Sequence, residues 1–169
     1  MSPVVVLVGP PGAGKTTVAE DLAARLGVTF RDTDHDIESH EGMSVQDIFI
    51  DHGEARFRTL EEKAIAVALA EHDGVLALGG GAVISAATRE LLQQHRVIFL
   101  DVGLAAAVSR VGMNANRPLL LGNVRSQLKA LMDGRRPLYT EVARFTIVTD
   151  DLDAAQVTDR ALALIQENR

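Results

Sequence analysis

Short segments rich in apolar residues alternate along this chain with longer segments in which apolar residues recur every three or four positions. The short segments cover residues 4–8, 29–31, 75–78, 97–100 and 145–148. Runs of this length predict β-strands, and the periodic segments between them predict helices. Because strands that alternate with helices form parallel sheets, the sequence predicts an α/β fold with five parallel strands flanked by helices.

One region breaks this alternation. Residues 112–122 contain two glycines, two asparagines and a proline between two helical segments. Such residues favour turns and irregular backbone, so we expect a mobile lid over residues 112–124. The 169 residues show no repeat or linker, and with 47% hydrophobic content they suit a single domain over 1–169.

Composition and charge limit the partners and the compartment. The net charge of −6 repels polyphosphate backbones, which argues against nucleic acid and anionic membranes as partners. The chain has no cysteine, which excludes disulfides and thiolate metal sites and suits a reducing, cytoplasmic location. No apolar run approaches the roughly 20 residues of a membrane span. With no obvious exposed apolar helix, we expect a monomer.

The segment GPPGAGKTT, residues 9–17, directly follows the first predicted strand. It matches the phosphate-binding loop Gly-x4-Gly-Lys-Thr, in which glycines turn backbone amides inward and a helix begins. We expect Lys15 to contact the β- and γ-phosphates of ATP, and Thr16 to bind Mg²⁺ through its hydroxyl. The residues expected to bind nucleotide here are Gly12, Ala13, Gly14, Lys15, Thr16 and Thr17.

Two aspartates follow the second predicted strand, in RDTD. They are expected at the carboxyl edge of the sheet, where ligands of open α/β sheets bind. One of them could hold Mg²⁺ through water while the other accepts a hydrogen bond from an acceptor hydroxyl and takes its proton, although Asp34 is also suited to capping the next helix. A rival magnesium ligand is Asp101, because an apolar strand ending in aspartate also matches the Walker B pattern.

Two further segments carry weaker signals. In EARFRTLEEK, Arg58, Glu61 and Glu62 lie off the apolar face that contains Phe57. An ion pair between Arg58 and Glu62, four residues apart, is an ordinary surface explanation for this arginine. In LALGGGAV, three consecutive glycines follow a strand, and such a run usually marks close approach of the backbone to a ligand.

Taken together, six ordered segments resemble those of the shikimate kinase family over essentially the whole chain. They are GPPGAGKTT, DTD, FRTLEE, LGGGAV, NRPLL and RRPLY. The resemblance implies a P-loop NTPase fold related to nucleoside monophosphate kinases. It also implies that ATP, with Mg²⁺, phosphorylates the 3-hydroxyl of shikimate in the route to chorismate and the aromatic amino acids.

The same resemblance implies roles for individual residues. Asp34 would bind the reacting hydroxyl, and Asp32 is preferred over Asp101 as the Mg²⁺ ligand. Arg58 and Arg135 would hold the substrate carboxylate. Matched position by position, the motif R-x-P-L-Y starts at Arg135 and not at Arg136. Most of the acceptor segment would lie within residues 33–62. The glycines expected to line the substrate ring are Gly79, Gly80 and Gly81.

The lid completes the implied site. Arg117 in NRPLL would reach the transferring phosphoryl group and act in catalysis with Lys15 and Asp34. Arg110 would stack on adenine, with an ordinary helix-surface position as the alternative. Two other functions stay open, namely a related P-loop kinase for gluconate or a nucleoside monophosphate, and a non-catalytic nucleotide-binding interaction protein. The paired arginines and the glycine run favour shikimate.

Overall fold

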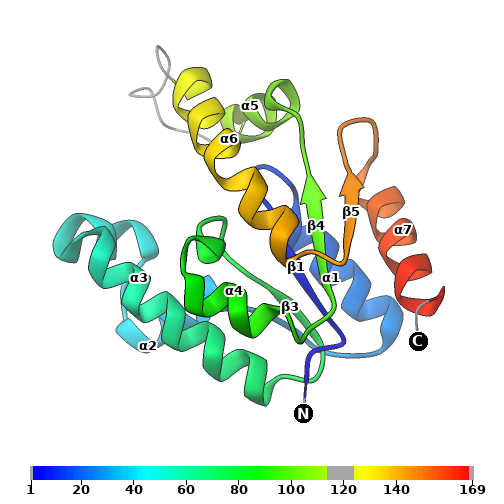
Figure 1. Ribbon diagram of the computed structural model, residues 1–169, viewed down its shortest axis with the longest axis horizontal. Helices are drawn as coiled ribbons and strands as arrows, with labels where there is room; N and C mark the ends of the chain where they lie inside the picture. Colours follow the sequence, from blue (N-terminus) through cyan, green and yellow to red (C-terminus); the bar gives the residue numbers. More distant parts are fainter. Residues whose placement is uncertain (1, 114–123, 168–169) are drawn as a thin grey trace.

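A computed structural model describes residues 2–113 and 124–167 of the protein (Figure 1). Its centre is one sheet of five strands in the order β2-β3-β1-β4-β5, and every neighbouring pair is parallel. The strands are β1 (Val5–Val8), β2 (Phe30–Asp32), β3 (Val75–Ala77), β4 (Val97–Asp101) and β5 (Phe145–Val148). The predicted five-stranded parallel fold is therefore confirmed.

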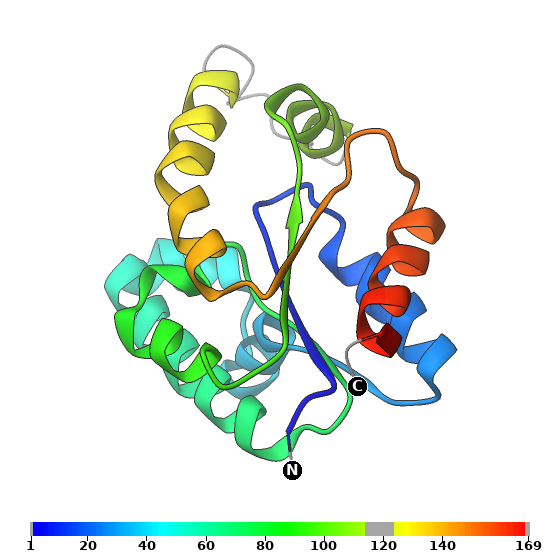
Figure 2. The same ribbon diagram turned by 45° about the vertical axis from the view of Figure 1, so that its right-hand side comes forward.

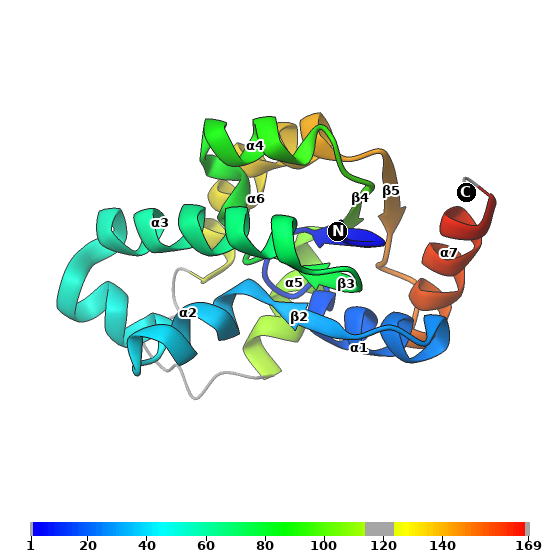
Figure 3. The ribbon, with the colours of Figure 1, turned by 90° about the horizontal axis from the view of Figure 1, so that it is seen from below.

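The helices lie on both faces of the sheet. Those on one face include α1 (Lys15–Leu26) and α7 (Ala154–Glu167), which lie side by side (Figure 2). The other face is covered by helices that include α3 (Val45–Glu71), α4 (Ala86–Leu92) and α6 (Val124–Val142), as the view from below shows (Figure 3). The remaining elements are α2 (Thr33–Glu41), the short 3₁₀ helix η1 (Ala82–Ile84) and α5 (Leu104–Met113).

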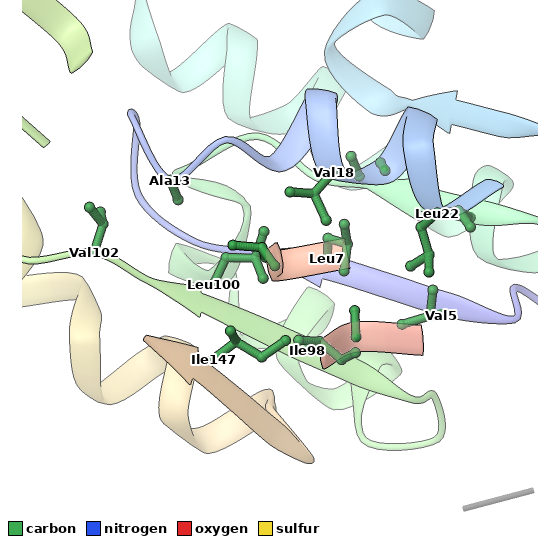
Figure 4. Packing of buried hydrophobic residues seen from close by; sticks show 14 of the residues in the cluster. Val5, Leu7, Ala13, Val18, Leu22, Ile98, Leu100, Val102 and Ile147 are labelled. Carbon is green, nitrogen blue, oxygen red and sulfur yellow. The ribbon is translucent and has the colours of Figure 1, made fainter. Parts of the chain in front are cut away.

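Strand β1 lies between β3 and β4, and helices bury both of its faces. Its side chains alternate, so Val5 and Leu7 pack toward α1 and α7, while Val6 and Val8 pack toward α3 and α6. Figure 4 shows Val5 and Leu7 against Val18 and Leu22 of α1. A strand with two buried faces must be apolar at every position, which explains the continuous run in the sequence.

Helix α1 is bounded by glycines. Gly14 precedes Lys15 with φ 81°, and Gly27 ends the helix with φ 69°, a left-handed conformation that glycine adopts without steric cost. Gly9 lies so close to β4 that a Cβ there would be 2.6 Å from the carbonyl oxygen of Leu100. The loop over residues 9–14 is thereby held against the end of the sheet.

Helices α2 and α3 form a small core of their own around Ile37, Ile48 and Phe57. Ser44 caps α3 by accepting a hydrogen bond from the amide of Asp47. Within α3 the chain bends at Gly53, whose φ of 84° and ψ of 166° are not helical. This bend separates the amino-terminal part of α3 from the part that carries Arg58 and packs on the sheet.

Most of the predicted lid, with Arg117, lies outside the described residues, so the expectation of a mobile segment there stays a prediction. Within residues 2–113 and 124–167, no helix combines the length and apolar character needed to cross a membrane.

Candidate active site

Four loops meet at one edge of the sheet. The glycine-rich loop follows β1, Asp32 ends β2, residues 79–81 follow β3, and Asp101 ends β4. Because all strands are parallel, their carboxyl ends share this edge, which is where ligands of such sheets bind. The arrowheads of β4 and β5 point toward it in Figure 1.

Lys15 lies inside the glycine-rich loop. Its Nζ donates hydrogen bonds to the carbonyl oxygens of Gly9 at 2.7 Å and Pro10 at 3.1 Å. Burial lowers the pKa of Lys15 to about 8, although the charges of Asp34 and Asp32 act in the opposite direction. The lysine charge is therefore close to both aspartates predicted for the site.

The two candidate magnesium ligands differ in what they contact. Thr16 Oγ1 donates to Asp32 Oδ2 at 3.4 Å, so a hydroxyl and a carboxylate come together beside the loop. Asp101 instead accepts a hydrogen bond from Arg136, with Nη1 and Oδ1 2.5 Å apart. Hard oxygen ligands of this kind fit Mg²⁺, and the geometry favours Asp32 over Asp101.

Asp32 also caps α2, since its Oδ1 accepts a hydrogen bond from the amide of Asp34 at 2.8 Å. The alternative role considered for Asp34, capping this helix, is therefore wrong. The cap satisfies a backbone donor at the helix start and fixes the residue that follows it. Asp34 is thereby free to face the site.

The carboxyl group of Asp34 is buried and has a raised pKa. Its Oδ1 is buried and has no hydrogen-bond partner among the described residues. Burial raises the pKa of Asp34 to about 6, nearby Asp32 raises it further, and Lys15 opposes both. A carboxylate that is partly desolvated in this way is a stronger proton acceptor than an ordinary aspartate.

Arg58 pairs with the carboxylates of Glu61 and Glu54, and not with that of Glu62. Its Nη1 donates to Glu61 Oε1 at 2.9 Å and its Nη2 to Glu54 Oε1 at 3.3 Å. The predicted pair with Glu62 is wrong, because Glu62 accepts from the Ser85 hydroxyl. The guanidinium carbon also lies 5.7 Å from the ring centroid of Phe49, within range of a cation–π interaction.

Glu61 is a site residue that sequence reasoning missed. The sequence pattern predicts it off the apolar face, but it is only 3% exposed. Burial raises the pKa of Glu61 against the opposing effect of Arg58. The four-residue spacing from Phe57 through position 61 to Ile65 was the available signal, because both neighbours on that face are buried.

The three glycines after β3 make room for side chains of the site. A Cβ on Gly79 would lie 2.7 Å from Asp34 Oδ1, and one on Gly81 would lie 2.5 Å from Arg58 Nη2. A Cβ on Gly80 would lie 3.2 Å from Pro11 Cδ in the glycine-rich loop. The close approach expected here therefore involves Asp34, Arg58 and the loop.

The two neighbouring arginines of α6 point to different partners. Arg136 pairs with Asp101, whereas Arg135 acts electrostatically on Lys15, Glu61 and Tyr139. Arg135 is therefore the one whose charge acts on the other predicted site residues.

On the other side of the loop, Arg110 donates hydrogen bonds to the Gly12 carbonyl at 2.9 Å and to the Thr149 hydroxyl at 3.3 Å. It lines a cavity of about 300 Å³ together with residues that include Ala13, Gly14 and Thr17. These contacts bring five of the predicted nucleotide-binding positions to one cavity and its rim.

A larger cavity of about 770 Å³ lies between α2 and α3. It is lined by Arg56, Lys63 and Val67 on the face of α3 opposite to Arg58 and Glu61, and its lining includes none of the predicted site residues. The volume of a cavity therefore does not identify the candidate active site. The better indicator is the edge of the sheet where carboxyl groups with raised pKa values lie near basic side chains.

The fold and this edge define a small P-loop phosphotransferase, in which a glycine-rich loop, a partly buried carboxylate and arginine side chains come together. A family model described as Shikimate kinase matches residues 11–166. The chain belongs to the shikimate kinase family and is a kinase with ATP as its co-substrate.

Individual relatives agree with this family. A shikimate kinase of Saccharopolyspora erythraea is 52% identical over 170 residues, covering 100% of this chain and 97% of the relative. One from Frankia casuarinae is 56% identical over 161 residues, covering 95% of this chain and 72% of the relative. Among solved structures, shikimate kinase from Acinetobacter baumannii in complex with shikimate has a TM-score of 0.91 at 40% identity, covering 100% of this chain and 95% of that one.

Proposed function

We propose that this chain, as a shikimate kinase, transfers the γ-phosphoryl group of ATP to the 3-hydroxyl of shikimate, giving shikimate 3-phosphate and ADP. The assignment of the reacting residues rests on the environment of the Asp34 carboxyl group. Its buried Oδ1 has no hydrogen-bond partner among the described residues, and Lys15 of the phosphate loop is among the charges that act on it. A proton acceptor and a phosphate-binding lysine are thus combined in one place.

At the acceptor end, Arg58 and Arg135 bind the shikimate carboxylate. Two guanidinium groups from distant segments fix both the position and the orientation of a small acid, because each forms charge-assisted hydrogen bonds. Within the described part of the chain, the amides of residues 79–81 donate no hydrogen bond in the protein. They are available to the substrate's oxygen atoms, which supports the predicted roles of Gly79, Gly80 and Gly81.

At the phosphate end, the amides of Gly12, Ala13 and Gly14 and the first turn of α1 surround the phosphates of ATP. Lys15 binds the β- and γ-phosphates, and Thr17 lies in the first turn beside the Arg110 cavity. Thr16 and Asp32 would hold Mg²⁺, which supplies charge neutralisation on the phosphate oxygens. Arg110 lies on the adenine side, and Arg117 stays the predicted contact of the transferring group.

The proposed transfer is a direct displacement. The 3-hydroxyl oxygen of shikimate forms a bond to the γ-phosphorus as the bond from that phosphorus to the ADP oxygen breaks. The hydroxyl proton passes to the Asp34 carboxylate. With its pKa raised to about 6, Asp34 is still largely ionised at neutral pH and is a stronger proton acceptor than an ordinary aspartate.

Three substrates in parallel test this proposal. ADP release is measured with shikimate, gluconate and AMP as acceptors, at equal concentrations and with Mg²⁺ present. We expect ADP release that depends on shikimate, with no rise above background for gluconate or AMP. Release with gluconate or AMP and none with shikimate would contradict the proposal, and no release with any acceptor would favour a nucleotide-binding role without catalysis.

We also propose a cytoplasmic monomer that binds neither nucleic acid nor membranes. The net charge of −6 and the absence of cysteine support this view. Sedimentation velocity with and without ATP measures the oligomeric state. A stable dimer at micromolar concentration would contradict the proposed monomer.

A further inference from the structure

We propose that Tyr139 is a positioning residue that holds residues 79–81 and Arg135 in the arrangement that shikimate binding requires. This inference rests on the proposed function. In this role Tyr139 contacts neither the 3-hydroxyl oxygen nor the γ-phosphorus, and it acts through the residues that it contacts. The chain of contacts runs from β4, through the tyrosine ring, to the glycine segment and the arginine.

The tyrosine is fixed by its surroundings. It is 1% exposed, and its ring stacks on Phe99 of β4 with centroids 4.9 Å apart and an angle of 30° between the ring planes. Its hydroxyl donates to the carbonyl oxygen of Gly80 at 2.5 Å. Because the ring is packed, the hydroxyl has little freedom to leave this carbonyl.

This hydrogen bond completes the set of carbonyl contacts in the glycine segment. The Gly79 carbonyl accepts from the Ala82 amide and the Gly81 carbonyl from the Ile84 amide, each at 3.1 Å. Tyr139 serves the carbonyl between them, so all three carbonyls are occupied by the protein. A carbonyl that is held also fixes the direction of the next residue's amide in the same peptide plane, so the contacts of the Gly79 and Gly80 carbonyls orient the amides of Gly80 and Gly81.

Small movements of this segment matter because Asp34 and Arg58 press against it. Gly79 and Gly81 leave no room for even a methyl group beside these side chains. A segment released at Gly80 would shift the surfaces against which the proton acceptor and one carboxylate ligand rest. Loss of one hydrogen bond would thus reach two substrate-binding side chains at once.

The same hydroxyl also meets Arg135, one helical turn earlier on α6. The guanidinium of Arg135 interacts with the Tyr139 oxygen, and burial raises the pKa of Tyr139 to about 12. The phenol therefore stays protonated at neutral pH and donates its proton to the Gly80 carbonyl. Tyr139 thus links the glycine segment to the second arginine that binds the carboxylate.

The variant Tyr139→Phe keeps the ring and removes only the hydroxyl. We expect its KM for shikimate to rise by about 5- to 20-fold, because the Gly80 carbonyl loses its partner, while its KM for ATP stays within about twofold of wild type. The matched control is Ile165→Val, a fully buried position in the core beside α1, which should lower stability while both KM values stay unchanged.

A second measurement separates positioning from general loosening. The ratio of kcat/KM for shikimate to that for its methyl ester reports how well the arginines recognise the carboxylate. We expect Tyr139→Phe to reduce this ratio by about threefold or more, and Ile165→Val to leave it unchanged. Should Tyr139→Phe fail to fold, Phe99→Leu, which loosens the ring and keeps the hydroxyl, should raise the KM for shikimate about two- to fivefold.

Unchanged shikimate kinetics in Tyr139→Phe, or an equal rise of both KM values, would overturn the inference. An unchanged ester ratio would overturn the part that involves Arg135. Failure of the proposed function itself looks different, because wild type and Ile165→Val would then also fail to phosphorylate shikimate.

Discussion

The two ends of this active site are built in different ways. The phosphate end comes from one contiguous segment, residues 9–17, and its main donors are backbone amides fixed by glycines and the start of α1. The acceptor end is assembled from α2, α3, α6 and the segment after β3, and its donors and acceptors are largely side chains. Asp34 and Arg58 there press directly against Gly79 and Gly81.

This difference predicts different sensitivities. Backbone amides keep their positions when side chains change, so the phosphate end depends mainly on its glycines and on Lys15. The acceptor end relies on partly buried charges with shifted pKa values and on contacts without spare room. Substitutions at the acceptor end should therefore affect shikimate kinetics strongly and ATP binding weakly.

The largest expected effect is that of Asp34→Asn. The amide keeps the shape but does not accept the proton, so kcat should fall by about 10²- to 10⁴-fold with little change in the KM for ATP. The control is Asp36→Asn on the same helix, where the carboxylate pairs with Arg31 at 2.6 Å. Steady-state kinetics with both substrates varied gives the result, and equal kcat values for the two variants would exclude Asp34 as proton acceptor.

The raised pKa of Asp34 adds a pH dependence. Below its folded-state pKa of about 6 the carboxylate is protonated, so kcat/KM for shikimate should fall about tenfold per pH unit. Because the folded state binds this proton more tightly than the unfolded state, whose pKa is near 3.8, the free energy of unfolding should decrease as pH rises from 4 to 6. Asp34→Asn should therefore raise Tm at pH 7 in calorimetry, and a lowered Tm would contradict this assignment.

The next effect is that of Arg58→Ala, which removes one proposed ligand of the substrate carboxylate. We expect a loss of about 2–4 kcal/mol in transition-state binding, measured as kcat/KM for shikimate. Arg56→Ala is the control, because Arg56 is exposed and lines the separate cavity between α2 and α3. If both variants behave like wild type, Arg58 has no role in substrate binding.

A smaller effect is expected from Gly79→Ala. The added methyl group would lie 2.7 Å from Asp34 Oδ1 and must displace it, so kcat/KM for shikimate should fall about 10- to 100-fold. Gly134→Ala in α6 adds the same methyl group where, apart from the adjacent residues and the backbone of its own helix, no described atom lies within 4 Å. It should leave the kinetics unchanged and raise the free energy of unfolding by about 0.5–1 kcal/mol. Equal kcat/KM values for the two variants would show that the close contact between Gly79 and Asp34 does not matter for catalysis.

The smallest predicted effect concerns magnesium at the phosphate end. Asp32→Ala should raise the Mg²⁺ concentration for half-maximal activity by about tenfold, because Asp32 is the carboxylate beside Thr16. Asp101→Ala should leave the Mg²⁺ titration unchanged, since Asp101 pairs with Arg136. The reverse order in the two titrations would assign the metal to Asp101.

Local sequence patterns predicted much of the fold. All five strands were located from short apolar segments. The phosphate loop was also evident, because its donors belong to consecutive residues. The buried carboxylate of Glu61 was missed, since a charged residue is ordinarily assigned to the solvent face unless its partner is known.

By itself, the sequence determined the parallel α/β architecture, the phosphate loop and the six segments that resemble a shikimate kinase. Which of two aspartates lies beside Thr16, which of two adjacent arginines pairs with Asp101, and which side chains approach the three glycines became evident only from the packed structure. Those choices depend on the strand order β2-β3-β1-β4-β5 and on the rotation of α6 about its axis. Both are set by the packing of distant segments, which short-range spacing along the chain does not encode.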